Sequence, residues 1–326
     1  MTTSPVVSIT VVDYLPAADL DGELADLGHA AVLGWPDQSP VTGSVVRSAL
    51  RATGTAATTL ALYRDLDGTL VGAAALRWPA TLEAPGWLWG PVVHPSVCNG
   101  GLGERLLAAI EDVLAARPGV RVVTAEIPDS RAAGWRLYER AGWHRIGAAS
   151  LLTRALPATR GWHTDPAGGG ITVRNARPGE YLDPSLAQLY AGTRPDLGHA
   201  TARDTYTRWT LDERYDPEGL LLAEDASGLA GAALVYPMTH NRYGEPYEAL
   251  LADLITGTWL APAPAQAVRA ALVDAALRTG AALGAVRARA IVDDPDLVET
   301  LLLAGFQVVD GVRYYAARGP GGLAHA

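Results

Sequence analysis

Residues 93–107 read VHPSVCNGGLGERLL, and this stretch decides the fold expected for the first half of the chain. The apolar run over 87–93 predicts a buried strand, which Pro95 ends. Apolar residues at helical spacing predict a helix over about 101–116. A glycine-rich loop joins the two, so the expected local order is strand, loop, helix.

The loop offers main-chain donors to an anion. Glycine lacks a Cβ, which lets a bulky group approach the backbone, and the first N–H groups of a helix have no partner inside it. These donors and the positive end of the helix dipole favour phosphate or pyrophosphate. The residues expected to bind it through their backbone are Asn99, Gly100, Gly101, Leu102, Gly103 and Glu104.

Two common nucleotide-binding motifs do not fit this loop. A P-loop requires Lys and then Ser or Thr after its last glycine, whereas Glu104 and Arg105 follow Gly103. A dinucleotide fingerprint that starts at Gly101 requires a third glycine where Leu106 stands. Nucleotide hydrolysis is therefore not expected, and the simplest alternative is a tight turn that binds nothing.

The composition limits the classes of function. Lys and Arg number 26 against 35 Asp and Glu, which gives a net charge of −9. An acidic surface disfavours a nucleic-acid partner and suits a cationic small substrate. Cys98 is the single cysteine, which excludes a disulfide within the chain, and no Cys/His cluster has zinc-site spacing, so no metal is expected. Without a signal-peptide pattern or an apolar run of ~18 residues, we expect a cytoplasmic protein that does not span a membrane.

The chain repeats a pattern about 160 residues further on. DLDGTLVGAAAL over 65–76 returns as DASGLAGAAL over 225–234, and each predicts a turn followed by a strand with glycine in place of a large side chain. A helix that ends in Ala-Gly-aromatic closes each half, at 141–143 and at 304–306. After each of these we expect a terminal pair of strands.

Two tandem copies of one α/β unit follow from this repeat. We expect domains over 1–154 and 171–326, each able to bury its own core, and a linker over 155–170 that contains Pro and Gly. In the first copy the periodicity predicts helices over 17–31, 44–52, 101–116 and 130–141, and strands over 58–65, 70–78, 87–93, 120–127 and 149–154.

The first copy resembles the GNAT superfamily of acyl-CoA-dependent N-acyltransferases over roughly residues 8–154. That family has a strand ending Val-x-Pro and then Arg or Gln-x-x-Gly-x-Gly or Ala at a helix start. VHP over 93–95 and CNGGLG over 98–103 match it, with Cys98 in place of Arg or Gln. The second signature, an aromatic-bearing helix running into Gly-aromatic, is matched by LYERAGW over 137–143.

The resemblance implies two tandem GNAT folds. In this fold the fourth and fifth strands of a twisted mixed sheet splay apart, and the pantetheine arm of the cofactor lies between them like a missing strand. These strands correspond here to 87–93 and 120–127. Proline cannot donate a ladder hydrogen bond, so Gly90-Pro91 is expected to form a bulge there.

The resemblance also implies acetyl-CoA as the donor and an N-acetyltransferase reaction, in which a primary amine attacks the thioester directly in a ternary complex. Tyr138 stands where the family carries the acid that protonates the leaving thiolate. A backbone N–H of Val92 or Val93 is expected to stabilise the oxyanion. An alternative for Tyr138 is simple packing of an amphipathic helix.

Some relatives use a glutamate on the fifth strand as the general base, and Glu126 lies at this position. Desolvation beside apolar strands raises the pKa of a carboxylate, which suits proton abstraction, but a solvated strand residue is an equal alternative. Further candidates for the base are Asp129, Glu83 and His94. Arg131 stands where many relatives have an asparagine that binds pantetheine.

The second copy lacks these features. Opposite the glycine loop it reads WLAPAPAQAV over 259–268, and Leu301 and Arg289 align with Tyr138 and Glu126. We therefore expect only the first half to bind acyl-CoA, with the second half as a degenerate copy that shapes the substrate cleft or the domain interface. Tandem GNAT enzymes of the mycothiol synthase type are similar in pairing two copies, but their second half is the catalytic one, so their substrate is not carried over.

The substrate is expected to be a small polar or cationic amine. The side chains that suggest it are aromatic or acidic, namely Trp78, Trp87 and Trp89 in the first copy and Trp209, Asp212, Glu213, Tyr215, Tyr236, Tyr243, Glu245, Tyr247 and Glu248 in the second. These aromatics can equally be core. A non-catalytic acyl-CoA sensor and a purely structural tandem domain stay open as alternatives, and the chain is expected to be a monomer, with its two domains as a pseudo-dimer, or a homodimer.

Overall fold

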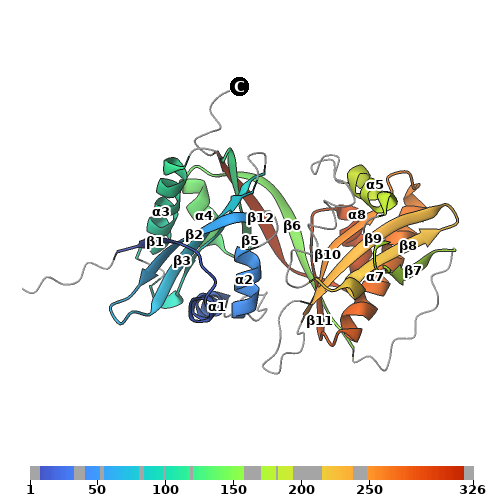
Figure 1. The fold of residues 1–326 in the computed structure, drawn as a ribbon, viewed down its shortest axis with the longest axis horizontal. Coiled ribbons are helices and arrows are strands. Elements are labelled where there is room, and N and C mark those ends of the chain that lie inside the picture. The colour runs from blue at the N-terminus through green and yellow to red at the C-terminus, as the bar shows by residue number, and fades with distance from the viewer. Residues whose placement is uncertain are drawn as a thin grey trace, which may run out of the picture. The chain divides into compact units, whose positions relative to one another are not determined.

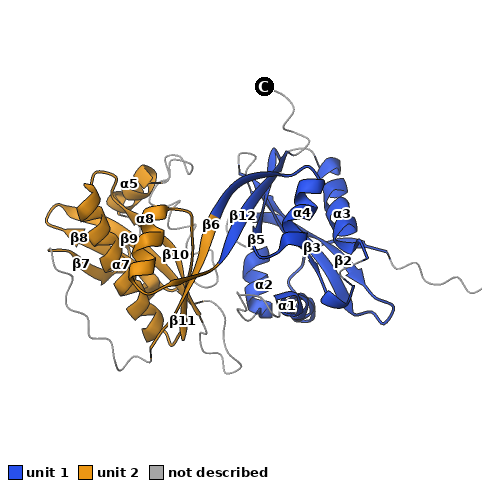
Figure 2. Cartoon of the chain, turned by 180° about the vertical axis from the view of Figure 1, so that it is seen from behind, with its two compact units in different colours: residues 1–148, 310–326 blue, residues 149–309 orange. Residues whose placement is uncertain are grey.

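The computed structural model describes residues 8–32, 41–51, 55–80, 84–97, 100–117, 120–157, 170–180, 183–193, 215–237 and 248–318. The chain forms two compact units, and neither is a continuous piece of sequence. Unit 1 contains residues 1–148 and 310–326, and unit 2 contains residues 149–309. Figure 2 shows the two units in different colours.

Unit 1 is built on a mixed sheet whose strand order is β1-β2-β3-β4-β5-β12. Its neighbours pair antiparallel except β4 and β5, which are parallel. The strands are β1 (Thr10–Asp13), β2 (Thr55–Arg64), β3 (Leu70–Pro79), β4 (Gly86–Val93), β5 (Val122–Pro128) and β12 (Gln307–Arg318). The strands expected over 58–65, 70–78, 87–93 and 120–127 are confirmed.

Helices cover both faces of this sheet (Figure 1). One face packs against α3 (Leu102–Ala116) and α4 (Ala132–Arg140) and forms a core around Leu106, Ile110 and Tyr138. The other face packs against α1 (Ala18–Val32) and α2 (Gly43–Leu50). The alternation of strand side chains between two apolar layers is what the mixed-sheet prediction requires.

A bulge interrupts β4 at the predicted place. Trp89 lies opposite Ala75, but Val92 lies opposite Ala73, so β4 holds one more residue than β3 across Gly90 and Pro91. Gly90 has a φ of 82°, and a Cβ there would lie 2.7 Å from the Val92 nitrogen. Only glycine fits that position.

Unit 2 repeats the plan, with strand order β7-β8-β9-β10-β11-β6. Again one neighbouring pair, β10 and β11, is parallel. The elements are β6 (His144–Ala155), β7 (Thr172–Asn175), α5 (Pro184–Thr193), β8 (Leu220–Asp225), β9 (Gly228–Pro237), β10 (Glu248–Thr256), α7 (Pro262–Ala282), β11 (Arg287–Val292) and α8 (Pro295–Leu303). Among the described helices of both units, none has the length and apolar character to cross a membrane.

The two copies end their last helices with the same turn. Gly142 and Gly305 both have positive φ, at 81° and 85°. In each turn the following aromatic residue donates its N–H to a carbonyl of the helix, Trp143 to Tyr138 at 2.9 Å and Phe306 to Leu301 at 3.0 Å. This shared geometry confirms the internal repeat and the alignment of Tyr138 with Leu301.

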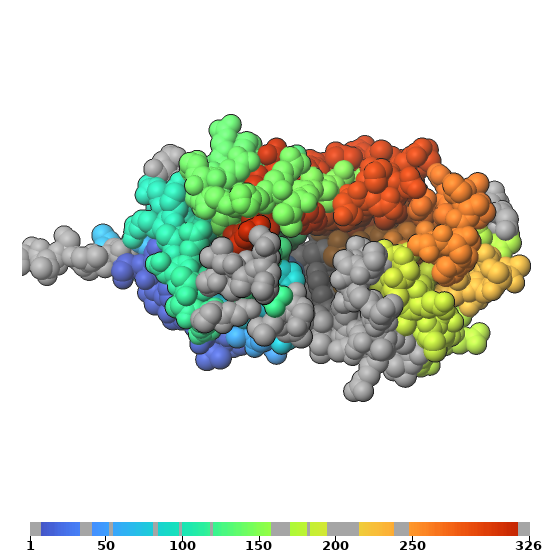
Figure 3. All heavy atoms as spheres, turned by 90° about the horizontal axis from the view of Figure 1, so that it is seen from above, coloured from blue at the N-terminus to red at the C-terminus, as the bar shows by residue number. Residues whose placement is uncertain are grey.

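The expected terminal strand pairs are wrong, because each half ends in one long strand that pairs with the other half. β6 pairs antiparallel with β11 in unit 2, and β12 pairs antiparallel with β5 in unit 1. Figure 2 shows both strands changing colour along their length, and Figure 3 shows red atoms of β12 beside green atoms of unit 1. The compact units therefore differ from the domains expected over 1–154 and 171–326, since the strands that complete each core come from the other half of the sequence.

Tyr315 on β12 tests this exchange. Its side chain is 0% exposed in the core of unit 1, its ring stacks on Tyr138 at 5.9 Å, and its hydroxyl donates to Glu139 at 2.9 Å. Removing so large a buried ring leaves a cavity, so Tyr315→Ala should lower the free energy of unfolding by about 3–5 kcal/mol. Denaturant unfolding measures the loss, and hydrogen exchange should place it in β5 and α4. A loss of hydrogen-exchange protection confined to α7 and α8 would contradict the pairing of β12 with unit 1.

Candidate active site

The glycine loop ends at Gly101, directly before α3, and this residue has a left-handed backbone conformation. Gly101 is the N-cap of α3, with a φ of 68° and no side chain that caps the helix. A Cβ built on Gly100 or Gly101 would meet no atom closer than 3.7 Å, so space lies in front of the loop. The first-turn N–H groups of α3 have no acceptor within the helix, which fits the anion site expected there. Asn99 and Cys98 lie outside the described residues.

The start of α3 is held tightly against its neighbours. A Cβ on Gly72 of β3 would lie 2.9 Å from Leu102, and a Cβ on Gly103 would lie 3.4 Å from Leu137 of α4. Leu102 is itself 4% exposed and packs in the core. Leu102 therefore offers only its backbone N–H at the start of α3, while Gly72 sets how closely α3 approaches the sheet.

The side chain of Glu104 forms an ion pair with Arg140. Its carboxylate accepts a hydrogen bond from Arg140 of α4 at 2.7 Å, and both side chains are exposed. The pair reduces the negative charge at the start of α3, where a free carboxylate would oppose an anionic ligand. Arg140 was not among the residues expected from the sequence, because no local pattern links α4 to the glycine loop.

The parallel strands β4 and β5 separate beside this loop. They pair only from Gly86 to Leu88 and from Val123 to Ala125, and then diverge. His94 donates its N–H to Val71 of β3 at 2.9 Å. Because N–H groups alternate along an antiparallel ladder, the Val92 N–H faces β3 and the Val93 N–H faces the side where β5 has separated. Of the two expected oxyanion donors, the geometry favours Val93.

Tyr138 reaches the same gap from α4. Its side chain is 2% exposed, and its hydroxyl donates to the carbonyl of Gly90 on β4. Its ring meets Trp143 edge to face at 4.8 Å. Burial, aided by the charge of Glu111, raises the pKa of Tyr138 far above its ordinary value. The phenol therefore stays protonated at any physiological pH, so it can act only as a proton donor.

Glu126 lies on β5 directly after the last residue that pairs with β4. Its side chain is exposed, on the face that α1 and α2 cover, so of the two alternatives left open by the sequence it matches the solvated strand residue. The nearby guanidinium of Arg77 stacks on Trp87 at 3.8 Å. Burial lowers the pKa of Arg77 to about 10, and the charge of Glu126 opposes that shift. Arg77 is therefore cationic at neutral pH and electrostatically coupled to Glu126.

Arg77 and Arg131 both bind the C-terminal turns of the helices on this face. Arg77 donates to the carbonyl of Ala49 in α2 at 2.8 Å, and Arg131 donates to that of Ala31 in α1 at 2.6 Å. A guanidinium at a helix C-terminus is favourable because the exposed carbonyls carry partial negative charge. The sequence analysis did not single out Arg77. The signal that could have found it is a charged residue inside the otherwise apolar strand β3.

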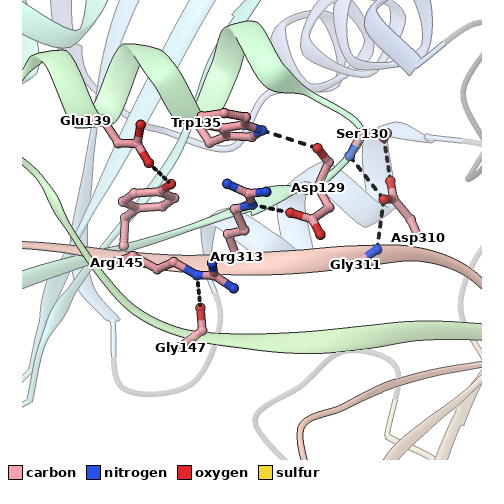
Figure 4. A network of polar contacts seen from close by, with 10 residues as sticks. Asp129, Ser130, Trp135, Glu139, Arg145, Gly147, Asp310, Gly311 and Arg313 are labelled. Atoms are coloured by element: carbon pink, nitrogen blue, oxygen red, sulfur yellow. Dashed lines mark hydrogen bonds and ion pairs between the residues drawn. The ribbon is translucent and has the colours of Figure 1, made fainter.

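The other expected bases have structural partners. Asp129 accepts from Arg313 of β12, whose guanidinium also lies 4.2 Å from the Trp135 ring (Figure 4). His94 contacts Ser96 through Nδ1, both at the hydroxyl, 2.7 Å away, and at the backbone N–H, 3.2 Å away. These contacts give both groups a role in the fold. Glu83 lies outside the described residues.

Several expected substrate-binding side chains are core residues. Trp78 is 8% exposed on the α3 face and donates to Thr59, so it does not join Trp87 and Trp89, which lie on the opposite face. In unit 2, Tyr236 and Glu248 are buried and Tyr215 packs against the core. The second-copy residues outside the described part are Trp209, Asp212, Glu213, Tyr243, Glu245 and Tyr247.

Unit 2 lacks the anion-binding loop. Its helix α7 begins at Pro262, and Pro264 also lies in the first turn, so two of the N–H donors are missing. Leu301, in the place of Tyr138, is 0% exposed and has no acidic proton. Arg289 stands on β11 in the place of Glu126.

A cavity of about 560 Å³ lies where β10 and β11 stop pairing, which is the corresponding place in unit 2. Its cationic side chain, Arg269, pairs with Asp296 at 3.1 Å. The acidic residues of the lining are Asp253, Asp293, Asp294 and Asp296. This charge disfavours a diphosphate at this place in unit 2.

Comparisons with known proteins define the class of this site. Residues 33–143 match the model of the acetyltransferase (GNAT) family. This part of the chain is therefore similar to a GNAT acetyltransferase domain, and it contains the glycine loop, the separated strands, Tyr138 and Glu126.

The relatives include a tandem protein. The chain is 32% identical over 197 residues to mycothiol acetyltransferase of Kineococcus radiotolerans; the alignment covers 57% of this chain and 60% of that relative. A tandem GNAT protein from the clavulanic acid biosynthesis pathway superposes with a TM-score of 0.69 at 20% identity, over 96% of this chain and 99% of that one. A GCN5-related N-acetyltransferase from Sphaerobacter thermophilus gives 0.68 at 19%, over 95% and 96%. The fold is thus that of two tandem GNAT units.

The glycine loop provides a direct test of the anion site. Gly101→Val places a branched side chain in front of the first-turn N–H groups of α3, and we expect the affinity for coenzyme A to fall at least tenfold, which is about 1.4 kcal/mol. Isothermal titration calorimetry with coenzyme A measures it. Gly68→Val is the matched control, because Gly68 also has a positive φ, of 84°, and lies in open space in the β2–β3 turn. Equal loss of affinity in both variants would exclude the loop as the site.

Proposed function

We propose that unit 1 transfers the acetyl group of acetyl-CoA to the primary amine of a small polar molecule, by direct attack in a ternary complex. The observation that carries this proposal is the separation of β4 and β5. The start of α3, the Val93 N–H, the Tyr138 hydroxyl and Glu126 all border this gap. An anion site, an oxyanion donor, a proton donor and a proton acceptor in one place suit acyl transfer from a thioester.

The chain fits acyl-CoA on structural grounds. Gly100 and Gly101 leave open space at the N-terminus of α3, where a Cβ would stand, and Leu102, Gly103 and Glu104 supply backbone donors to a diphosphate. When bound, the thioester supplies an activated carbonyl carbon and a thiolate leaving group. Val93 is the donor that stabilises charge on the carbonyl oxygen.

Two side chains move protons in this reaction. Glu126 accepts a proton from the attacking ammonium, directly or through water, so that the nitrogen forms its bond to the carbonyl carbon. Tyr138 gives its proton to the sulfur as the C–S bond breaks. The acylated nitrogen loses its second proton as the amide forms, and this proton restores Tyr138, directly or through water. The net result is an amide and free coenzyme A, with one proton left on Glu126 and then released to solvent.

The relatives support an acetyl donor and an amine acceptor. One relative is named mycothiol acetyltransferase, and two structural neighbours are described as a GCN5-related N-acetyltransferase and a tandem GNAT protein. We infer the same reaction class here, without the acceptor of any of them. The alignment covers only 60% of the curated relative.

Tyr138→Phe tests the acid. The variant keeps the ring and its packing but removes the proton, so kcat should fall about 10²- to 10⁴-fold while the affinity for coenzyme A is unchanged. The assay measures release of coenzyme A from acetyl-CoA with a panel of primary amines. The ordinary pKa of a tyrosine is about 10. Because the pKa of Tyr138 is raised above this value, the kcat of the wild type should show no loss from ionisation of Tyr138 up to about pH 10. A variant with the kcat of the wild type would assign Tyr138 to packing alone.

Glu126→Gln tests the base. A carboxylate is needed only while the amine is protonated, so kcat/KM for the amine should fall about 10²-fold at neutral pH. The deficit should shrink as the pH rises toward the pKa of the amine, because the neutral nucleophile then forms without help. A pH-independent deficit would show that Glu126 does not abstract the proton.

A non-catalytic acyl-CoA-binding protein is the second candidate. It is favoured by the engagement of the Tyr138 hydroxyl with the Gly90 carbonyl, which a packing role also explains. Tight binding of coenzyme A without turnover of any amine would support this alternative.

A further inference from the structure

The last strand of the chain places an aromatic residue beside Glu126. In the ladder between β12 and β5, Tyr314 lies directly opposite Glu126. Directly opposed residues of an antiparallel pair project to the same face of the sheet, with Cβ atoms about 4.5–5.5 Å apart. Tyr314 is half-buried and Glu126 is exposed.

The neighbours of Tyr314 on β12 fix this arrangement. Arg313 pairs with Asp129 and lies over Trp135 of α4, as Figure 4 shows. Tyr315 stacks on Tyr138 and bonds to Glu139 of α4. Both contacts are on the α4 face, so the alternation of side chains along a strand directs Tyr314 to the opposite face. A shift of one residue in the register of β12 against β5 would break both contacts and bury Tyr314 in the core.

On its own face Tyr314 stands at one end of a row of side chains. Thr124 and Glu126 of β5 separate it from Trp87, which lies opposite Thr124 on β4. Arg77 stacks on the ring of Trp87 at 3.8 Å. On the far side, the Tyr314 ring lies 3.5 Å from the Cβ position of Gly147 in β6. An exposed carboxylate thus has an aromatic side chain on each side, and a guanidinium stacks on that of Trp87.

We propose that Tyr314 is a specificity-determining residue of the acyltransferase site, whose ring binds the cationic end of the amine acceptor beside Glu126. The inference rests on the proposed function and deepens it. A ring face attracts an ammonium through its quadrupole, and Glu126 supplies the opposite charge. The chemical class recognised is a primary alkylammonium, which Glu126 then deprotonates. The proposed site in unit 1 thereby depends on β12, the last strand of the chain.

Substitutions in the full-length chain test the proposal. Tyr314→Ala should raise KM about tenfold for the best primary alkylamine of the panel, with KM for acetyl-CoA unchanged. Tyr314→Phe should keep both values within about twofold, because the ring is retained. Tyr314→Leu keeps the bulk without the ring and should behave like Tyr314→Ala, which provides a second variant if the alanine substitution prevents folding. An O-alkylhydroxylamine, which is neutral at pH 7, should show no change in KM with any of these variants.

Trp259→Ala is the control, because Trp259 is a 56% exposed aromatic residue of unit 2 outside the proposed site. Its KM values should equal those of the wild type. A parallel rise of KM for acetyl-CoA in Tyr314→Ala, an equal loss with the neutral amine, or a phenylalanine variant as impaired as the alanine one would overturn the role of Tyr314 alone. An active wild type with unchanged KM in Tyr314→Ala and Tyr314→Leu would do the same. Absence of turnover by the wild type with every amine would overturn both this role and the proposed function.

Discussion

The separation of β4 from β5 after three paired residues on each strand is the constraint on which the site depends. Parallel strands normally continue their ladder, so the gap requires a cause within the chain. The extra residue in β4 at Gly90 and Pro91 supplies it, because a bulge bends the strand and increases its local twist. The gap then exposes one edge of β4, and α3 and α4 bring their donors to it. In unit 2 the strands also separate, but the prolines of α7 remove N–H donors there and the lining of the cavity is acidic.

Strand exchange makes the two halves of the chain dependent on each other. β12 completes the sheet of unit 1, and β6 completes that of unit 2. The consequence for the site is that Arg313, Tyr314 and Tyr315, near the end of the sequence, contact the region of Asp129, Glu126 and Tyr138. A buried tyrosine stack and an ion pair set the register of this strand, so stability and site geometry depend on the same contacts.

Local motifs predicted the parts of the candidate site that are formed by the backbone. The glycine loop, the start of α3, the bulge at Gly90 and the position of Tyr138 on the last helix follow from short patterns whose physics is local: φ values, free N–H groups and the missing donor of proline. Side chains whose partners lie on other strands were harder to predict from the sequence. The exposure of Glu126, the pairing of Asp129 and the burial of Trp78 depend on which face a residue occupies and on what packs there, and a one-residue difference in register reverses the face. Arg77 and Arg140 were missed because their partners lie on other elements.

By itself, the sequence determined that the chain contains two copies of one α/β unit, that the first copy carries the glycine loop and the tyrosine, and that the second copy has lost both. These are properties of residue type and spacing within one element. Only the tertiary structure decided that each copy ends in a strand paired with the other copy, and which side chains surround Glu126. An edge strand accepts any partner of matching pattern through main-chain hydrogen bonds that carry no residue identity, so the choice between neighbours is made by packing of the whole sheet.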